Sequence, residues 1–521
     1  MAVLNQYRLQ PSGAGTNLIW SADLGLHYGL LTRNETLINK CRNLLVDEIR
    51  ITIEDGIQPD FSFHQHKERL QIYHYGHSYL TENIRLAWQM KGTVYAFPEE
   101  KINILINYIF KGWQWMARGV NTVPGAIDRS VTRPGRLRYA DIRFYIPFLK
   151  EIAPKDKKAF NSLLSYQDGK HALDGYQYYP YSDFAVYQQP KFSFFLKTQS
   201  SRTLSSEIIN NENLHGRLMN SGDAYLIDKG DEYFDLMPVW NWNLLPGITA
   251  FHGAQRIDRK PYGGAVSNGR SGLSAMDYKL DGNAGQSVSA HKIWASHDGF
   301  IVCLVSNLIS ENLSESIYTV LNQCRLRGNV SVNTSSKPLP EGKNHLNGVR
   351  WIHHAGFAYI LLEPAEVVVT LVNQTGSWFD INKSGSKELI TEKVFTPIIK
   401  HSGAHKNGFG YVLAKCNTPI GAEKLSKKNS FNVLSNNGEV QAVEFKDGTL
   451  MGAIFSKTPA VVSGKIIFES DGPCLFQVSH GFLYISDPLH AGRLINIKIN
   501  GVPYTVTLHA DGTSSKVKLI E

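Results

Sequence analysis

The spacing of apolar residues divides the chain into a helical first third and a strand-rich remainder. Between residues 23 and 49, apolar positions recur every three or four residues, which is the period of an amphipathic helix. A turn and a helix N-cap are predicted near residues 34–36, so this stretch forms two helices. The same spacing predicts a second pair over 80–90 and 102–116 and one more helix between 141 and 164.

Beyond about residue 167, short apolar runs and period-two alternation replace the helical spacing. A polar segment rich in Pro, Gly and Lys, 331–348, predicts a surface loop, and a Lys/Ser-rich stretch, 417–429, predicts a connector. The block at 440–519 has the short strands of a small sandwich, such as 494–499 and 504–508. Strands are expected at 192–195, 299–305, 357–362, 367–372 and 410–413.

Segregated helices and strands indicate separate domains and not alternating βαβ units. We expect a helical domain at 1–165, a large β domain at 166–415 and a small β-sandwich at 416–521. A chain of 521 residues is long enough for this, since one core rarely serves so many residues.

Composition excludes several classes of protein. A hydrophobic content of 42% and a charged content of 19% are those of a folded globular chain. No run of Lys and Arg and no nucleic-acid module stands out, so nucleic acid is not an expected partner. No apolar run approaches the ~20 residues that span a membrane, and the N-terminus has no signal-peptide core. The net charge of +8 suits an acidic polymer or, equally, an ordinary solvated surface.

The five cysteines are odd in number, far apart and without a CxxC pair, so we interpret them as small buried apolar residues.

Titratable aromatic residues gather in one connector between two helical segments, residues 60–76. Loops held by a rigid scaffold often carry catalytic groups. We expect His66 and Tyr75 to form a proton-transfer pair; alternatively, both are ordinary surface-loop aromatic residues. A zinc site is disfavoured because no Cys or carboxylate stands at ligand spacing from the histidines in and beside this connector, His64, His66, His74 and His77.

Five motifs in one order resemble the polysaccharide lyases that cleave chondroitin, hyaluronan and xanthan (polysaccharide lyase family 8). The resemblance runs from about residue 13 to about residue 415, and we extend it to the last domain. The motifs are Gly15-Thr16-Asn17, Gln65-His66, Tyr75-Gly76, the loop with Arg129 and Arg133, and a segment from Ser201-Arg202-Thr203 through Glu207 and Asn210 to Trp240-Asn241-Trp242.

The resemblance implies an α+β multidomain fold: an N-terminal α/α toroid, a large antiparallel β super-sandwich and a small C-terminal β-sandwich. The family's toroid has several more helices before the Asn-bearing turn, including an aromatic patch that guides the polymer. Those would precede Met1, so we expect either a truncated form or a shortened toroid.

The implied reaction is β-elimination beside a uronic acid, which leaves a 4,5-unsaturated sugar. The resemblance assigns Tyr75 as base and then acid, with Asn17 and His66 holding the carboxylate; His66 is the alternative base for the epimeric uronate. Glu207 orients the catalytic groups, and Asn210 lines the cleft.

Such an elimination needs a neutralised carboxylate, a base and an acid, and electrostatic stabilisation is its largest contribution. Tyrosine is protonated at neutral pH unless a cation lies beside it. Arg129 or Arg133 can supply that charge and bind the acidic substrate. Trp113 and Trp115, just before the arginine loop, are either core residues or sugar platforms.

No metal and no other cofactor is expected. Some relatives bind calcium through aspartates near the Trp-x-Trp segment, where this chain has Asn241, Asn243 and His252. Neutral ligands bind calcium less well than carboxylates do.

The leading hypothesis is therefore a lyase for an acidic polysaccharide, a glycosaminoglycan such as chondroitin or hyaluronan first and xanthan or alginate second. The rival from another class is a non-catalytic protein that binds acidic glycans. A hydrolase would need two acids at the cleft, and only Glu207 can be assigned there. We expect a monomer that is secreted or periplasmic and has no membrane partner.

Overall fold

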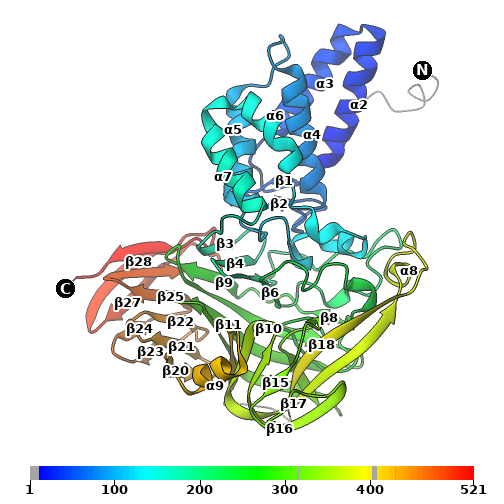
Figure 1. Cartoon of the computed structure of the whole chain (residues 1–521). Coiled ribbons are helices and arrows are strands. Elements are labelled where there is room, and N and C mark those ends of the chain that lie inside the picture. Colours follow the sequence, from blue (N-terminus) through cyan, green and yellow to red (C-terminus); the bar gives the residue numbers. More distant parts are fainter. Residues whose placement is uncertain (1–10, 315, 402–407, 429, 521) are drawn as a thin grey trace. The chain divides into compact units, whose positions relative to one another are not determined.

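The structure is a computed structural model that describes residues 11–314, 316–401, 408–428 and 430–520. The chain forms two compact units, Met1–Leu173 and Asp174–Glu521 (Figure 1). The first unit is helical and the second is built of strands, which confirms the predicted order of helices and then antiparallel sheets. The division into three domains at residues 165 and 415 stays a prediction.

The helical unit contains the two predicted helix pairs. The break near residue 34 is a helix start, because the Asn34 side chain accepts a hydrogen bond from Leu37 N at 3.0 Å. The helices are α2 (Thr16–Thr32), α3 (Glu35–Glu48), α4 (Tyr75–Met90), α5 (Glu99–Asn107), α6 (Ile146–Ile152) and α7 (Lys157–Gln167), and α5 continues as the π-helical segment η1 (Tyr108–Trp113).

The prediction of a single helix between residues 141 and 164 is wrong, since α6 and α7 share that stretch. The cause is Pro154, which disfavours helical dihedrals at the residue before it. Ala153 accordingly has φ −134° and ψ 69°, and α6 ends there.

The second unit holds a 13-stranded antiparallel sheet among its described residues, with β17 (Phe357–Gly376) between β18 (Ile390–His401) and β19 (Phe409–Lys415) near its centre. A four-stranded sheet precedes it in sequence: β3 (Gly175–Tyr179), β4 (Phe184–Gln189), β5 (Phe192–Lys197) and β6 (Asp223–Ile227). The large sheet consists of β7 (Thr249–Ala250), β8 (Arg256–Ile257), β9 (Gly263–Ser267), β10 (Gly272–Asp281), β11 (Ser287–His297), β12 (Phe300–Glu311), β13 (Ile317–Val320), β14 (Cys324–Arg325), β15 (Ser331–Val332), β16 (Gly342–His354), β17 (Phe357–Gly376), β18 (Ile390–His401) and β19 (Phe409–Lys415).

Two predictions in this sheet are wrong. The stretch 331–348 is not a loop, because it contains β15 and the first half of β16, which pairs with β17. Residues 342–348 are exposed or half-buried, so a polar sequence suits this part of the strand. The runs at 357–362 and 367–372 belong to one strand, β17.

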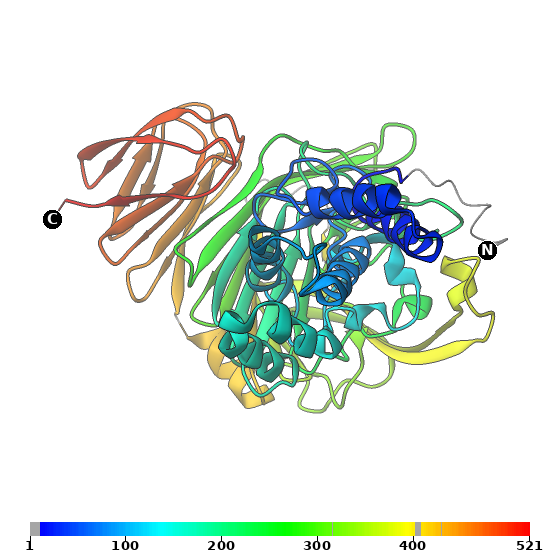
Figure 2. The ribbon, with the colours of Figure 1, turned by 90° about the horizontal axis from the view of Figure 1, so that it is seen from above.

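The last block is a two-layer sandwich, as predicted, and Figure 2 shows its strands in orange and red. Its apolar core includes Phe468 and Phe476, whose rings stack at 3.7 Å. The segment predicted as a connector holds α9 (Pro419–Lys427). One layer is β20 (Phe431–Asn436), β21 (Val440–Phe445), β22 (Leu450–Ile454), β25 (Cys474–Ser479), β26 (Phe482–Ser486) and β29 (Ser515–Lys518); the other is β23 (Ala460–Ser463), β24 (Ile467–Ser470), β27 (Leu494–Ile499) and β28 (Val502–Thr507).

All five cysteines are free and buried, which confirms their interpretation as apolar packing residues. No helix in the described part of the chain is both long and apolar enough to cross a membrane.

Candidate active site

The turn before α2 is fastened to the connector that carries His66. Thr16 N donates to Oε1 of Gln65 at 3.1 Å, and Thr16 Oγ1 donates to the carbonyl oxygen of Tyr75 at 2.7 Å. Gly15 has φ 57°, and a Cβ there would lie 2.4 Å from Gln65 Oε1, so only glycine fits. Asn17, the next residue after Thr16, is exposed. Because Thr16 is bonded to Tyr75, the first residue of α4, the backbone of Asn17 is held near the start of that helix.

His66 lies at the tip of a tight turn in the connector. His66 and Lys67 both have left-handed backbones, with φ 59° and 71°, which is uncommon outside glycine. Two hydrogen bonds fix the turn: Lys67 N donates to Asp55 Oδ1 at 2.8 Å, and Arg69 Nη1 donates to the His66 carbonyl at 2.8 Å. Residues in such conformations gather at functional sites.

Tyr75 is the first residue of α4 and is half-buried. Its ring centroid lies 4.9 Å from that of His66 and 4.5 Å from that of His74. The next residue, Gly76, has no room for a side chain, because a Cβ there would lie 2.6 Å from the Tyr108 hydroxyl. The close packing at Gly76 is a structural reason for the Tyr-Gly pair.

Arg129 brings the two predicted catalytic groups together. It lies in the 3₁₀ segment η3 (Asp128–Thr132) and is 4% exposed. Its Nη2 donates to Oη of Tyr75 at 3.1 Å, and its Nη1 lies 3.4 Å from Nδ1 of His66. Because a guanidinium can only donate, Nδ1 of His66 is the acceptor, and neutral His66 carries its proton on Nε2.

Positive charge surrounds this cluster. Burial lowers the pKa of His74 well below its ordinary value of 6.5, and the charges of Arg129, Arg133 and Arg136 lower it further. His74 is therefore neutral near pH 7, and its Nδ1 donates to Oε1 of Gln71 at 2.8 Å. A site of this kind favours an anionic ligand.

The two predicted tryptophan platforms differ. Trp113 is fully buried, its Nε1 donates to the Ala140 carbonyl at 2.8 Å, and its ring meets that of Tyr73 edge to face at 4.7 Å. The prediction that it contacts substrate is wrong, because neither ring face is open. Trp115 and Arg133 are half-buried, and their roles as substrate contacts stay predictions.

Glu207 and Asn210 belong to the second unit, and the structure describes them within that unit alone. Glu207 is buried, and its carbonyl accepts from Nδ2 of Asn213 at 3.0 Å. Asn210 is exposed with φ 54°, a conformation that asparagine tolerates better than most residues. The loop around them is tied to the segment after α8 (Trp378–Ile381), since Lys383 N donates to the Asn211 carbonyl at 2.9 Å.

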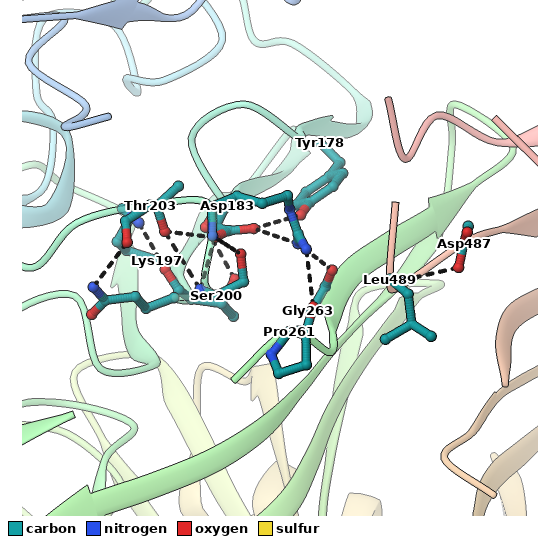
Figure 3. A network of polar contacts seen from close by, with 12 residues as sticks. Tyr178, Asp183, Lys197, Ser200, Thr203, Pro261, Gly263, Asp487 and Leu489 are labelled. Carbon is teal, nitrogen blue, oxygen red and sulfur yellow. Dashed lines mark hydrogen bonds and ion pairs between the residues drawn. The ribbon is translucent and has the colours of Figure 1, made fainter. Parts of the chain in front are cut away.

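A buried carboxylate anchors the segment that leads into this loop (Figure 3). Asp183 accepts hydrogen bonds from Oγ of Ser200 at 2.7 Å and Oγ1 of Thr203 at 2.6 Å, and Arg202 pairs with it at 3.4 Å. Burial alone would raise the pKa of Asp183, but Arg202, Lys197 and the two hydroxyls hold it at about 2. The Ser-Arg-Thr motif is thus a structural anchor.

The residues that match the family's calcium site do not fit that ion. Oδ1 of Asn243 accepts a hydrogen bond from Nη2 of Arg217 at 2.8 Å, and Oδ1 of Asn241 accepts from Asn243 N at 3.1 Å. A guanidinium on a ligand oxygen opposes a divalent cation there. Among the described residues, no group of three or more His, Cys, Asp or Glu could hold a metal ion.

Sequence reasoning missed Trp20 as a member of this site. Its ring centroid lies 5.9 Å from that of Tyr75. The apolar spacing predicted a helix only from residue 23, whereas α2 begins at Thr16, so it did not put Trp20 on one helix face with Asn17 three residues earlier.

Comparison with known proteins agrees with the geometry of this cluster. Three family models match the chain: the N-terminal alpha-helical domain of polysaccharide lyase family 8 at residues 4–162, its super-sandwich domain at 174–419 and its C-terminal beta-sandwich domain at 432–496. The chain belongs to polysaccharide lyase family 8. It is thereby a carbon–oxygen lyase of the type that acts on polysaccharides (EC 4.2.2).

Individual family members differ in their similarity to the chain. Chondroitinase-AC of Pedobacter heparinus is 31% identical over 512 residues, which cover 92% of this chain and 71% of that protein. A hyaluronate lyase of Thermasporomyces composti is 22% identical over 97% of this chain and 71% of its own length.

Solved structures support the same fold. A chondroitinase AC lyase studied in oligosaccharide complexes superposes with a TM-score of 0.89 at 27% identity, covering 97% of this chain and 78% of that one. A Paenibacillus xanthan lyase superposes with a TM-score of 0.87 at 21% identity, covering 98% of this chain and 57% of its own, which bears on the fold alone.

Proposed function

We propose that this family 8 lyase cleaves a uronic-acid-containing polysaccharide by β-elimination, with a chondroitin- or hyaluronan-like glycosaminoglycan as its substrate class. The observation that carries the proposal is the hydrogen bond of 3.1 Å from Arg129 to the Tyr75 hydroxyl, with His66 on the same guanidinium. The 31% identity to a chondroitinase AC supports the choice of substrate class.

Tyr75 performs both proton transfers. A guanidinium that donates to the phenol oxygen stabilises negative charge on it. The phenolate takes the C5 proton of the uronate, the electrons of that C–H bond form the C4–C5 double bond, and the C4–O bond breaks. The phenol then returns the proton to the leaving glycosidic oxygen, so no water is consumed.

Asn17 and His66 hold the substrate carboxylate. Negative charge builds up on this carboxylate as the C5 proton leaves, and neutral or cationic donors stabilise it. The exposed amide of Asn17 and the Nε2–H of His66 are such donors. Because Nε2 is protonated in this tautomer, the donor role suits His66 better than the role of base for an epimeric uronate.

The remaining predicted residues act around this centre. Arg133, half-buried directly after the segment η3 that carries Arg129, binds an acidic group of the polymer. Trp115 contacts a sugar. For the second unit, we propose Glu207 as an orienting residue and Asn210 as a cleft-lining residue. We further propose a monomeric protein that is secreted or periplasmic.

The test is the ultraviolet absorbance of the unsaturated uronate during incubation with chondroitin, hyaluronan, xanthan and alginate, followed by the mass of the products. A lyase gives products whose masses sum to that of the substrate, whereas a hydrolase adds one water. Absorbance that rises on chondroitin or hyaluronan supports the proposal. A rise on xanthan or alginate alone would change the substrate class, and no rise by a folded protein would favour a glycan-binding protein without turnover.

A further inference from the structure

Trp20 carries an exposed indole beside the proposed catalytic tyrosine. Its side chain is 45% exposed, although tryptophan is one of the costliest residues to leave in water. The ring planes of Trp20 and Tyr75 are inclined by 44° at a centroid distance of 5.9 Å. At this exposure, part of the indole surface is open beside the Tyr75 ring.

The second exposed tryptophan, Trp88 in α4, provides a contrast. It is 37% exposed, its Nε1 donates to Oε2 of Glu151 at 2.9 Å, and its ring packs on Phe148 at 4.7 Å. The indole N–H of Trp88 is thus hydrogen-bonded, and its ring is packed against a neighbouring ring. In the part of the chain that the structure describes, the Trp20 indole N–H has no such hydrogen bond.

Trp20 is not needed to hold Tyr75 in place. The Tyr75 hydroxyl is bound by Arg129, whose guanidinium carbon also lies 5.6 Å from the centre of the tyrosine ring. The Tyr75 backbone is fixed by the start of α4 and by the hydrogen bond from Thr16 Oγ1. Support for Tyr75 therefore does not explain an exposed tryptophan.

The surroundings of Trp20 suit one kind of ligand. Asn17 lies three residues before it on the same face of α2, and the Arg129 guanidinium contacts the same tyrosine, Tyr75. Amide and guanidinium groups bind carboxylates and hydroxyls, while an open aromatic face packs against the C–H face of a pyranose ring. Together they match a sugar that is polar at its edge and apolar on its face.

We propose that Trp20 is a sugar-stacking platform that holds the pyranose adjoining the bond to be cleaved. This inference rests on the proposed function, because it takes the sugar to be part of an acidic polysaccharide. Trp20 does not take part in proton transfer; it supplies binding energy that positions the polymer over Tyr75.

The experiment measures binding without turnover. The 521-residue chain with Tyr75→Phe is titrated by calorimetry with chondroitin and hyaluronan tetrasaccharides, alone and combined with Trp20→Ala, Trp20→Phe or Trp88→Ala. We expect Trp20→Ala to raise the Kd by about tenfold, as for one lost aromatic anchor. Trp20→Phe should lose less, because a flat ring remains, and Trp88→Ala should leave the Kd unchanged.

An unchanged Kd in the Trp20→Ala variant would overturn the inference, as would an equal loss in Trp88→Ala. In the protein that retains Tyr75, Trp20→Ala should raise KM and leave kcat at saturating polymer within about threefold, since the loss of uniform binding acts on KM. A fall in kcat with unchanged Kd would instead assign Trp20 to the support of Tyr75.

The two proposals fail in different ways. If the tetrasaccharides bind through Trp20 but the intact protein yields no unsaturated product, the platform stands and the lyase proposal falls. If unsaturated product forms but the Kd does not depend on Trp20, the lyase proposal stands and the platform falls. No binding of either tetrasaccharide would overturn the platform, whatever the absorbance assay shows.

Discussion

Arg129 donates a hydrogen bond from Nη2 to the Tyr75 hydroxyl at 3.1 Å, although the two residues lie 54 positions apart in sequence. The same guanidinium faces Nδ1 of His66 at 3.4 Å. One buried cation therefore fixes the orientation of the proposed base and the tautomer of the proposed carboxylate donor.

Arg129→Lys should lower kcat by about 10²-fold, because an ammonium cannot bond both partners with the fixed fork of a guanidinium. The charge is retained, so the loss would report geometry. Steady-state absorbance kinetics measure it, with Arg138→Gln as the control, since Arg138 is exposed in the neighbouring segment η4 (Arg136–Arg138). Equal activity of Arg129→Lys and the wild type would contradict the role of Arg129.

Gln65→Ala should both destabilise the helical unit and lower kcat. Gln65 joins Thr16 N to Asp55 Oδ2, its amide lying 2.7 Å from that carboxylate. Removing it leaves buried polar groups without partners, at a cost of about 1–3 kcal/mol. Chemical denaturation measures the stability and the product assay measures kcat. A stable variant with full activity would show that the turn bearing Asn17 does not depend on Gln65.

The helical unit should lose stability as the pH falls below about 6.5. The pKa of folded His74 lies well below its ordinary value of 6.5, so between these two values the unfolded chain binds a proton that the folded chain does not. The contribution of neutral His74 to the free energy of unfolding is fully present above pH 6.5. It declines as the pH falls toward the folded pKa, by up to about 1.4 kcal/mol per pH unit. Thermal unfolding of the wild type and His74→Asn at pH 8, 6.5 and 5.5 measures this.

His74→Asn should show a shallower decline than the wild type, because it removes one of the groups whose protonation opposes folding. Burial lowers the pKa of His77 as well, so part of the decline remains. Parallel curves for the two proteins would contradict the assignment of His74 as a buried neutral histidine.

Asp183→Asn should destabilise the second unit by about 3 kcal/mol, since it leaves the charge of Arg202 without its partner. Because the folded pKa of Asp183 is held at about 2, below its ordinary 3.8, the carboxylate's contribution is present above pH 4 and is lost as the pH falls toward 2. Denaturation at pH 7 and pH 3 measures both effects. Equal stability of variant and wild type at pH 7 would contradict the anchor.

The sequence predicted the helical and strand-rich parts because their apolar periods differ. It failed where a polar stretch forms regular structure. The first residues of β16 (Gly342–His354) are mostly polar and exposed or half-buried, so the pattern predicted a loop. They form a long strand because β17 supplies their hydrogen bonds. Pairing partners distant in sequence are not visible in a local pattern.

The candidate site was predicted in part. His66, Tyr75 and Arg129 were found because their residue types suit the chemistry and their order resembles the family, and the structure brings these three together. Trp113 was misassigned because position before the arginine loop does not reveal burial, which here is complete. Trp20 was overlooked because its significance lies in a contact with Tyr75, which a sequence does not display.

The most direct measurement of the central claim is the absorbance of unsaturated uronate produced by Tyr75→Phe beside the wild type, on chondroitin and hyaluronan. Phenylalanine keeps the ring and removes only the hydroxyl that accepts from Arg129. The account predicts a loss of about 10²–10⁴-fold in kcat with unchanged folding, as expected for a general base that is also the acid. Full activity of Tyr75→Phe would show that another residue takes the C5 proton.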